Sequence, residues 1–132
     1  MFFSQGIDIV DNERIRKTYE KYGNNFLKKF LTKREINFIN KNNKKFHLKL
    51  ANRFAAKEAM AKAMGSGFRN RIFFKDIEIM NTSKGKPFII CSSKVLNYLE
   101  KNHKKIDNSN IFLSIADEKK FSVAIVSIFN SE

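Results

Sequence analysis

The sequence predicts an α+β fold in which a largely antiparallel sheet packs against one long helix. Residues 3–10 read as a strand and are followed by several helical segments. The longest of these covers residues 46–64, is dense in Ala and Leu, and stops at Gly65. The second half of the chain holds two strand pairs joined by polar turns, which indicates antiparallel hairpins.

The predicted elements, in chain order, are a strand at residues 3–10, helices at 12–22, 26–31, 32–40 and 46–64, a turn at 41–45, strands at 72–80 and 87–91, a helix at 93–103, and strands at 111–116 and 121–129. Asp11 or Asn12 is expected to cap the first helix, with Gly23 at its end. Thr32 and Glu35 have the spacing of a capping box at the start of a later helix.

The composition favours one globular domain, covering residues 1–132. Cys91 is the only cysteine, so no intrachain disulfide can form and a reducing compartment fits best. We find no export signal and no run of about 18 apolar residues. The expectation is therefore a soluble cytoplasmic protein without a membrane span.

The net charge of +13 is concentrated in residues 14–57, where 14 Lys and Arg face only two acidic residues. Such a field attracts anionic partners and speeds their encounter. Charge alone leaves nucleic acid, anionic lipid and an acidic protein open, and part of the lysine excess can be compositional bias. A non-catalytic basic nucleic-acid-binding module is therefore one alternative function for the chain.

Asp8 is an acidic residue inside an otherwise apolar strand, Gly-Ile-Asp-Ile-Val at residues 6–10. Strand geometry puts Ile7 and Ile9 on one face and Asp8 on the other. The local pattern fits a solvated outer face of an edge strand. The functional interpretation is a carboxylate held on a rigid backbone, with Gly6 leaving room for a ligand.

Glu58 lies in the middle of the long helix, in Arg-Phe-Ala-Ala-Lys-Glu-Ala at residues 53–59. On its own it reads as half of a surface pair with Lys62, four residues later. The flanking alanines allow another backbone or a ligand to come close, and Lys57 and Lys62 would place two ammonium groups beside the carboxylate. Magnesium is usually held by one or two carboxylates together with phosphate oxygens and water. The two acids and the lysines therefore suit a pyrophosphate site.

The chain resembles the holo-(acyl-carrier-protein) synthase family of 4′-phosphopantetheinyl transferases. Two blocks carry the resemblance: Gly-Ile-Asp-Ile-Val at residues 6–10, and Arg-Phe-Ala-Ala-Lys-Glu-Ala at 53–59 with Lys-Ala-Met-Gly-Ser-Gly at 62–67. Further matches are Phe-Leu-Thr at 30–32, Asp-Ile-Glu-Ile at 76–79 and Gly-Lys-Pro at 85–87. Together they span residues 6 to about 128.

The resemblance implies the 4′-phosphopantetheinyl transferase fold and an enzyme that moves phosphopantetheine from coenzyme A to a serine of an acidic acyl carrier protein. It implies Mg²⁺ held by Asp8 and Glu58, a docking role for Arg14, and a homotrimer with active sites between subunits. Carrier domains of synthases are an alternative target, but the single-domain length and the match pattern favour the fatty-acid carrier type. Glu58 is the first candidate base for the serine proton, with Glu35 as the second, and Lys62 would steady phosphate charge. The residues matched to coenzyme A are Arg53, Lys62, Gly65, Ser66, Gly67, Gly85, Lys86 and Pro87.

The chain departs from the family pattern at Asp117. Many members have Ser-Ile-Ser-His where this chain has Ser-Ile-Ala-Asp at residues 114–117. Asp117 is expected to be a turn residue. His47 and His103 have no second His or Cys at ligand spacing, which argues against zinc.

Overall fold

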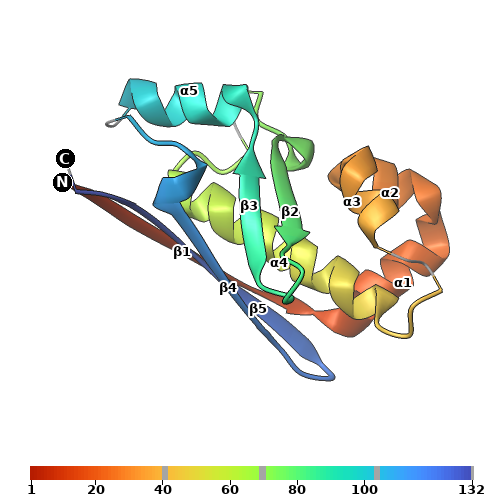
Figure 1. Ribbon diagram of the computed structural model, residues 1–132. Helices are drawn as coiled ribbons and strands as arrows, with labels where there is room; N and C mark the ends of the chain where they lie inside the picture. The colour runs from red at the N-terminus through yellow and green to blue at the C-terminus, as the bar shows by residue number, and fades with distance from the viewer. Residues whose placement is uncertain (40–41, 69–70, 103–104, 132) are drawn as a thin grey trace.

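The computed structural model describes residues 1–39, 42–68, 71–102 and 105–131. Its elements appear in the predicted order, and the α+β prediction is confirmed (Figure 1). The elements are β1 (Phe2–Asp11), α1 (Asn12–Tyr22), α2 (Asn24–Phe30), α3 (Lys33–Phe38), α4 (Phe46–Met64), β2 (Ile77–Asn81), β3 (Pro87–Cys91), α5 (Ser93–Asn102), β4 (Ile111–Asp117) and β5 (Phe121–Asn130).

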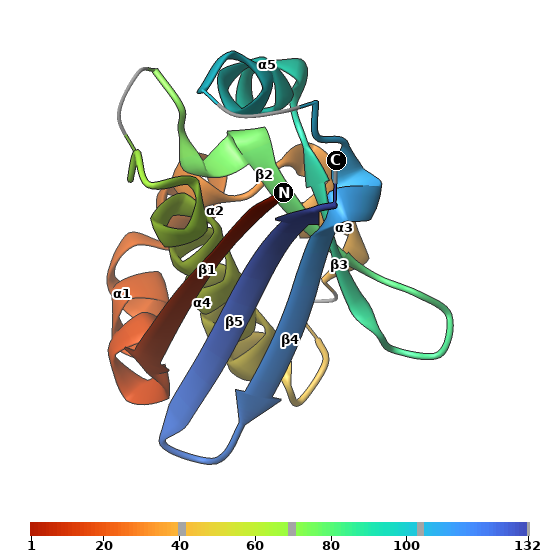
Figure 2. The same cartoon turned by 90° about the vertical axis from the view of Figure 1, so that its left-hand side faces the viewer.

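The strands form two antiparallel sheets. One has three strands in the order β1-β5-β4, and the other is the β2–β3 hairpin. β1 pairs with β5 along its whole length, from Phe2 opposite Asn130 to Asp11 opposite Phe121. Helix α4 lies behind the three-stranded sheet in Figure 2, and the face toward the viewer carries no helix. The core lies between α4 and the sheet.

Gly6 allows β1 to cross α4 at backbone contact. A β-carbon at this position would lie 2.0 Å from the carbonyl oxygen of Ala59 and 2.5 Å from the amide nitrogen of Ala63. The prediction that Gly6 leaves room for a ligand is therefore wrong, because the backbone of α4 occupies that space. The small alanines of α4 contribute to the same close approach.

The predicted caps are confirmed. The side chain of Asp11 accepts hydrogen bonds from the backbone of Glu13 and Arg14 at the start of α1. Thr32 and Glu35 form the reciprocal capping box of α3. Helix α4 begins and ends at the predicted residues.

Three expectations need correction or lie outside the described residues. β2 begins at Ile77, because a 3-10 turn, Phe74–Asp76, precedes it and Asp76 accepts from the amide of Phe73. Asp8 faces inward, whereas Ile7 and Ile9 are about 60% exposed on the outer face. The predicted helix ends at residues 40 and 103 lie outside the described residues.

Within the described residues, we find no helix long and apolar enough to cross a membrane.

Candidate functional site

Asp8 and Glu58 line one cavity of about 420 Å³. Asp8 comes from β1 and Glu58 from the middle of α4, so the Gly6 crossing sets their separation. Both side chains are only partly exposed. The remaining lining residues come from β1, α1, α2 and α4, and are Ile9, Val10, Asp11, Arg14, Ile15, Thr18, Phe26 and Phe54.

Lys62 joins α4 to β1, the strand that carries Asp8. Its Nζ donates to Asp8 Oδ1 at 3.1 Å and to the carbonyl oxygen of Ile7 at 2.9 Å. The lysine side chain is 55% exposed, whereas that of Asp8 is 17% exposed. The ammonium group therefore remains accessible to a ligand while it orients the Asp8 carboxylate.

Glu58 is electrostatically coupled to Asp8. Burial raises the pKa of Glu58, the Asp8 carboxylate raises it further, and Lys62 acts in the opposite direction. Two carboxylates facing one cavity repel each other, and a cation between them relieves that repulsion. Within the described residues, no group of three or more His, Cys, Asp and Glu could hold a metal. Two carboxylates are nevertheless the usual number of protein ligands in a magnesium site where phosphate oxygens supply further ligands.

Glu35 lies in the core, away from this cavity. Its side chain is 0% exposed, and Oε1 accepts from Lys57 Nζ at 2.7 Å. Oε1 also accepts from the amide of Thr32, and Oε2 accepts from the amide of Ile79. With both oxygens engaged and no solvent access, Glu35 cannot reach a substrate proton, so the prediction of a second base is wrong.

Lys57 also differs from the expectation. It is fully buried and donates to Glu35, to the carbonyl oxygen of Phe74 and to the carbonyl oxygen of Ile77. Its ammonium group therefore holds α4 against the start of β2 and does not lie beside Glu58.

Arg53 lines a second cavity, of about 430 Å³, which also contains Gly85 and Pro87. Arg53 is 3% exposed, and its Nη2 donates to Asn81 Oδ1 at 2.9 Å. Its Nε is buried without a hydrogen-bond partner among the described residues. Lys45 and Lys49 line the same cavity. This cationic pocket suits an anion, but its lining residues differ from those of the Asp8–Glu58 cavity.

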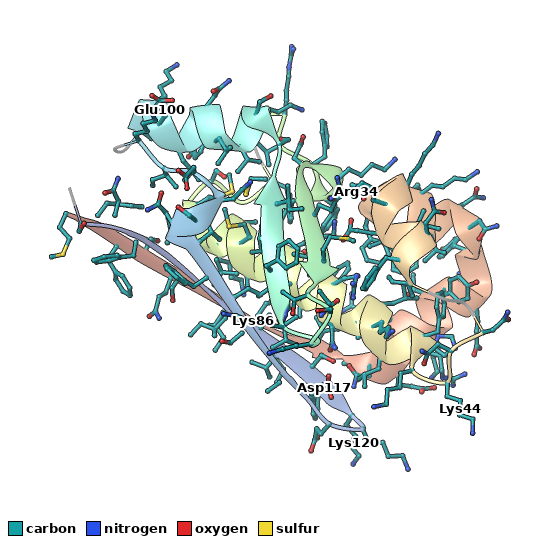
Figure 3. All side chains as sticks on the ribbon, in the orientation of Figure 1. Arg34, Lys44, Lys86, Glu100, Asp117 and Lys120 are labelled. Carbon is teal, nitrogen blue, oxygen red and sulfur yellow. The ribbon has the colours of Figure 1, made fainter. Side chains whose placement is uncertain are left out.

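Asp117 was expected to be a turn residue, but it is the last residue of β4. It lines the Arg53 cavity, and its Oδ2 accepts from Asn52 Nδ2 at 2.9 Å. Figure 3 shows Asp117 close to the β4–β5 turn, where Lys120 is also labelled.

The predicted glycines lie in two places. Gly65 and Gly67 follow α4 with φ angles of 80° and 61°, and the Ser66 hydroxyl between them donates to the carbonyl oxygen of Gly67. Gly85, with a φ angle of 92°, and the exposed Lys86 belong to the β2–β3 turn.

Arg14 is exposed on α1 and lines the Asp8–Glu58 cavity. The sequence interpretation did not assign a site role to Phe54 or to Thr18, which also line this cavity. The four-residue spacing from Phe54 to Glu58 is a signal that could have identified the first of them.

Comparison with known proteins identifies the family to which the chain belongs. The model of the 4′-phosphopantetheinyl transferase superfamily matches residues 4–126. The chain is 46% identical over 123 residues to a holo-[acyl-carrier-protein] synthase of Pelagibacter ubique, covering 92% of this chain and 91% of that one.

Solved structures give the same result. The fold matches a holo-[acyl-carrier-protein] synthase from Neisseria meningitidis with a TM-score of 0.84 and 34% identity, covering 96% of this chain and 98% of the other. It also matches the Helicobacter pylori synthase in complex with coenzyme A, with a TM-score of 0.78, 31% identity, and coverage of 92% and 96%. The predicted family and fold are thereby confirmed.

Proposed function

This chain belongs to the 4′-phosphopantetheinyl transferase superfamily, and we propose that it transfers 4′-phosphopantetheine from coenzyme A to a serine of apo acyl carrier protein. The observation that carries the proposal is the cavity where Asp8 and Glu58 meet, with Lys62 bonded to Asp8. In the reaction, the serine oxygen forms a bond to the phosphorus nearest pantetheine. The pyrophosphate P–O bond breaks, and adenosine 3′,5′-bisphosphate leaves with its electron pair.

Asp8 and Glu58 would hold Mg²⁺ through carboxylate oxygens, their preferred mode for this hard cation. A bound Mg²⁺ supplies Lewis acidity and neutralises the pyrophosphate charge. Lys62 would stabilise the charge that develops on the leaving bisphosphate, since its ammonium group is paired with Asp8 and its side chain is 55% exposed.

The serine must lose a proton as it attacks, and Glu58 is the candidate acceptor. Burial and the Asp8 carboxylate raise the pKa of Glu58, which increases its affinity for that proton. Binding of Glu58 to a metal would reduce this basicity. The assignment of Glu58 as the base is therefore a separate proposal from its assignment as a metal ligand.

The carrier protein would dock on α1 beside this cavity. Arg14 is exposed at its edge, and Lys17 and Lys21 line the adjoining pocket on the same helix. An acidic partner would be guided by this charge. We also propose a cytoplasmic role in fatty acid biosynthesis, in line with a single free cysteine, Cys91.

A homotrimer would explain why Arg53, Gly85 and Pro87, three of the predicted coenzyme A residues, line a different cavity from the proposed metal ligands. In one chain Glu58 and Lys62 face β1, whereas Arg53, Gly85 and Pro87 line the other cavity. An active site between subunits would join the first cavity of one protomer to the second cavity of its neighbour.

The uncovered sheet face supports this assembly. Six large apolar side chains, 38–62% exposed, project from the strands on the side opposite α4; they are Phe3, Ile7, Ile9, Phe112, Phe121 and Phe129. A contiguous exposed apolar face of this kind marks an interaction site. Light scattering should therefore give three times the 15.4 kDa mass of one chain. Phe112→Glu should lower that mass, whereas Tyr22→Glu on α1 should leave it unchanged.

The central test measures the mass of the carrier protein. The enzyme is mixed with apo acyl carrier protein, coenzyme A and Mg²⁺, and one phosphopantetheine should be added to each carrier. Asp8→Ala and Glu58→Ala should each lower kcat by at least about a hundredfold. The control Glu100→Ala, on the exposed surface of α5, should transfer at the wild-type rate.

Chelation of divalent ions should stop transfer, and added Mg²⁺ should restore it. An unmodified carrier in the presence of folded enzyme would refute the activity. Wild-type turnover in either acidic variant would refute the metal assignment instead.

The nucleic-acid alternative has weaker support. Arg53 and Lys57, two cations of the basic segment, are buried and cannot neutralise a phosphate backbone on the surface. Retention of DNA or RNA at physiological salt, with a steep loss as salt rises, would favour the alternative. We expect no retention under those conditions.

A further inference from the structure

The segment that follows α4 is linked to the wall of the Asp8–Glu58 cavity by a chain of aromatic contacts. Gly67 N donates to the carbonyl oxygen of Ala61, which holds the start of the segment to the helix. The ring centroids of Phe68 and Phe74 are 4.2 Å apart, and those of Phe74 and Phe54 are 5.5 Å apart. Phe54 lines the cavity. Phe68 is therefore connected to the cavity wall through Phe74.

The far end of this segment has an uncommon backbone conformation. Arg71 has a φ angle of 62°, and within the described residues it is the only residue other than glycine with a positive φ. A side chain with a β-carbon adopts this region at a cost, so surrounding contacts must hold it.

Lys94, from the first turn of α5, supplies such contacts. Its Nζ donates to the carbonyl oxygen of Arg71 at 2.7 Å and lies 3.4 Å from Asp76 Oδ2. The same ammonium group lies 5.2 Å from the ring centroid of Phe73. Asp76 in turn accepts from the amide of Phe73 at 2.8 Å and from the hydroxyl of Ser92 at 3.0 Å. One lysine and one carboxylate therefore fasten residues 71–73 to the start of α5.

Lys94 is not needed to form the core. Its side chain is 46% exposed, whereas Val95 and Leu99 hold α5 to the core at 0% exposure. Loss of the ammonium group should release residues 71–73 without detaching the helix.

We propose that Lys94 is a positioning residue of the donor site, acting through the carbonyl oxygen of Arg71. By fixing residues 71–73, next to the Phe74 ring that packs on Phe68, it keeps residues 65–68 in the shape that receives the phosphates of coenzyme A. This inference rests on the proposed function, because it assigns the glycines at residues 65–67 to that donor. Lys94 itself touches no substrate.

The test compares Lys94→Met and Lys94→Arg with Lys101→Met, a control at an exposed lysine in the last turn of the same helix. Three quantities are measured on the full chain: coenzyme A affinity by calorimetry with Mg²⁺, KM and kcat for transfer, and amide hydrogen exchange at residues 71–73.

In Lys94→Met, exchange at residues 71–73 should accelerate, and the KM and Kd for coenzyme A should rise roughly five- to twentyfold. The kcat should stay within about twofold of wild type. Lys94→Arg retains a donor for the Arg71 carbonyl and should recover most of the affinity, and Lys101→Met should match wild type.

Two outcomes separate this inference from the proposed function. If the wild-type protein transfers the group and Lys94→Met binds coenzyme A with wild-type affinity, the positioning role is refuted and the function stands. If the wild-type protein binds no coenzyme A, both fail. A matching loss of kcat and thermal stability in Lys94→Met would also refute positioning, because it would indicate a general structural role.

Discussion

The buried pair of Lys57 and Glu35 gives the sharpest stability prediction. Both side chains are 0% exposed, with Nζ and Oε1 separated by 2.7 Å. Lys57→Met keeps most of the apolar stem and removes only the ammonium group. The Glu35 carboxylate then stays buried without its counter-charge, and the carbonyl oxygens of Phe74 and Ile77 lose a donor.

Removing one partner of a buried ion pair costs about 3–5 kcal/mol. For a chain of this length, that should lower Tm by roughly 10–20 °C. Burial lowers the pKa of Lys57, and the Glu35 carboxylate opposes this change. The charged form of Lys57 therefore depends mainly on that adjacent carboxylate. Without that carboxylate, the lysine would be an isolated buried charge.

Calorimetry at a fixed protein concentration measures the effect, because assembly would make Tm depend on concentration. Lys57→Met combined with Glu35→Gln removes the uncompensated charge and should recover part of the lost stability. Lys101→Met, at an exposed lysine, should change the free energy of unfolding by less than about 0.5 kcal/mol. A Lys57→Met loss below about 1 kcal/mol, or a double variant no more stable than the single one, would refute the reasoning.

The remaining predictions concern backbone contact, thiol reactivity and docking. Gly6→Ala should cost at least about 1–3 kcal/mol in urea denaturation, because its β-carbon would clash with backbone atoms of α4; wild-type stability would contradict this crossing. Burial raises the pKa of Cys91 to about 12, so the native thiol should react with a disulfide reagent at pH 8 roughly a hundredfold or more slowly than the unfolded chain; equal rates would show that the thiol is accessible. Arg14→Glu should raise the KM for the carrier about tenfold and leave that for coenzyme A unchanged; an unchanged carrier KM would remove Arg14 from the docking surface.

The caps and the long helix could be predicted because their signals are local. Asp11, the Thr32–Glu35 box and Gly65 act within a few residues of themselves, and each lies where the sequence places it. The start of β2 could not be predicted in this way. Ile72 is apolar and buried, as a strand residue would be, but the Asp76 side chain bonds to the backbone of Phe73 and forms a 3-10 turn.

The surroundings of the acidic pair depend on tertiary contacts. Asp8 in an edge strand reads as exposed, and only the crossing at Gly6 shows that its face is covered by α4. The capping box identified Glu35 as a helix-start residue, but the pairing with Lys57 joins residues 22 positions apart. No local pattern reports such a contact, so an acidic residue that belongs to the core was predicted to be a base.

The geometry of α4 explains why adjacent basic residues have different roles. Successive helical residues point about 100° apart, whereas residues four apart share a face. Glu58 and Lys62 therefore lie in one row, which faces β1, and Arg53 and Lys57 lie in a neighbouring row, which faces β2.

Under the proposed function, the donor carries both a pyrophosphate and a separate phosphate, and cations from both rows would bind them. The two rows diverge around the helix axis, and Arg53 opens into a different cavity from Glu58. The proposed trimer removes this conflict by supplying the Arg53 row from a neighbouring chain. Mixing inactive Glu58→Ala chains with inactive Arg53→Ala chains should therefore restore transfer at mixed interfaces, whereas a site built within one chain would give no such recovery.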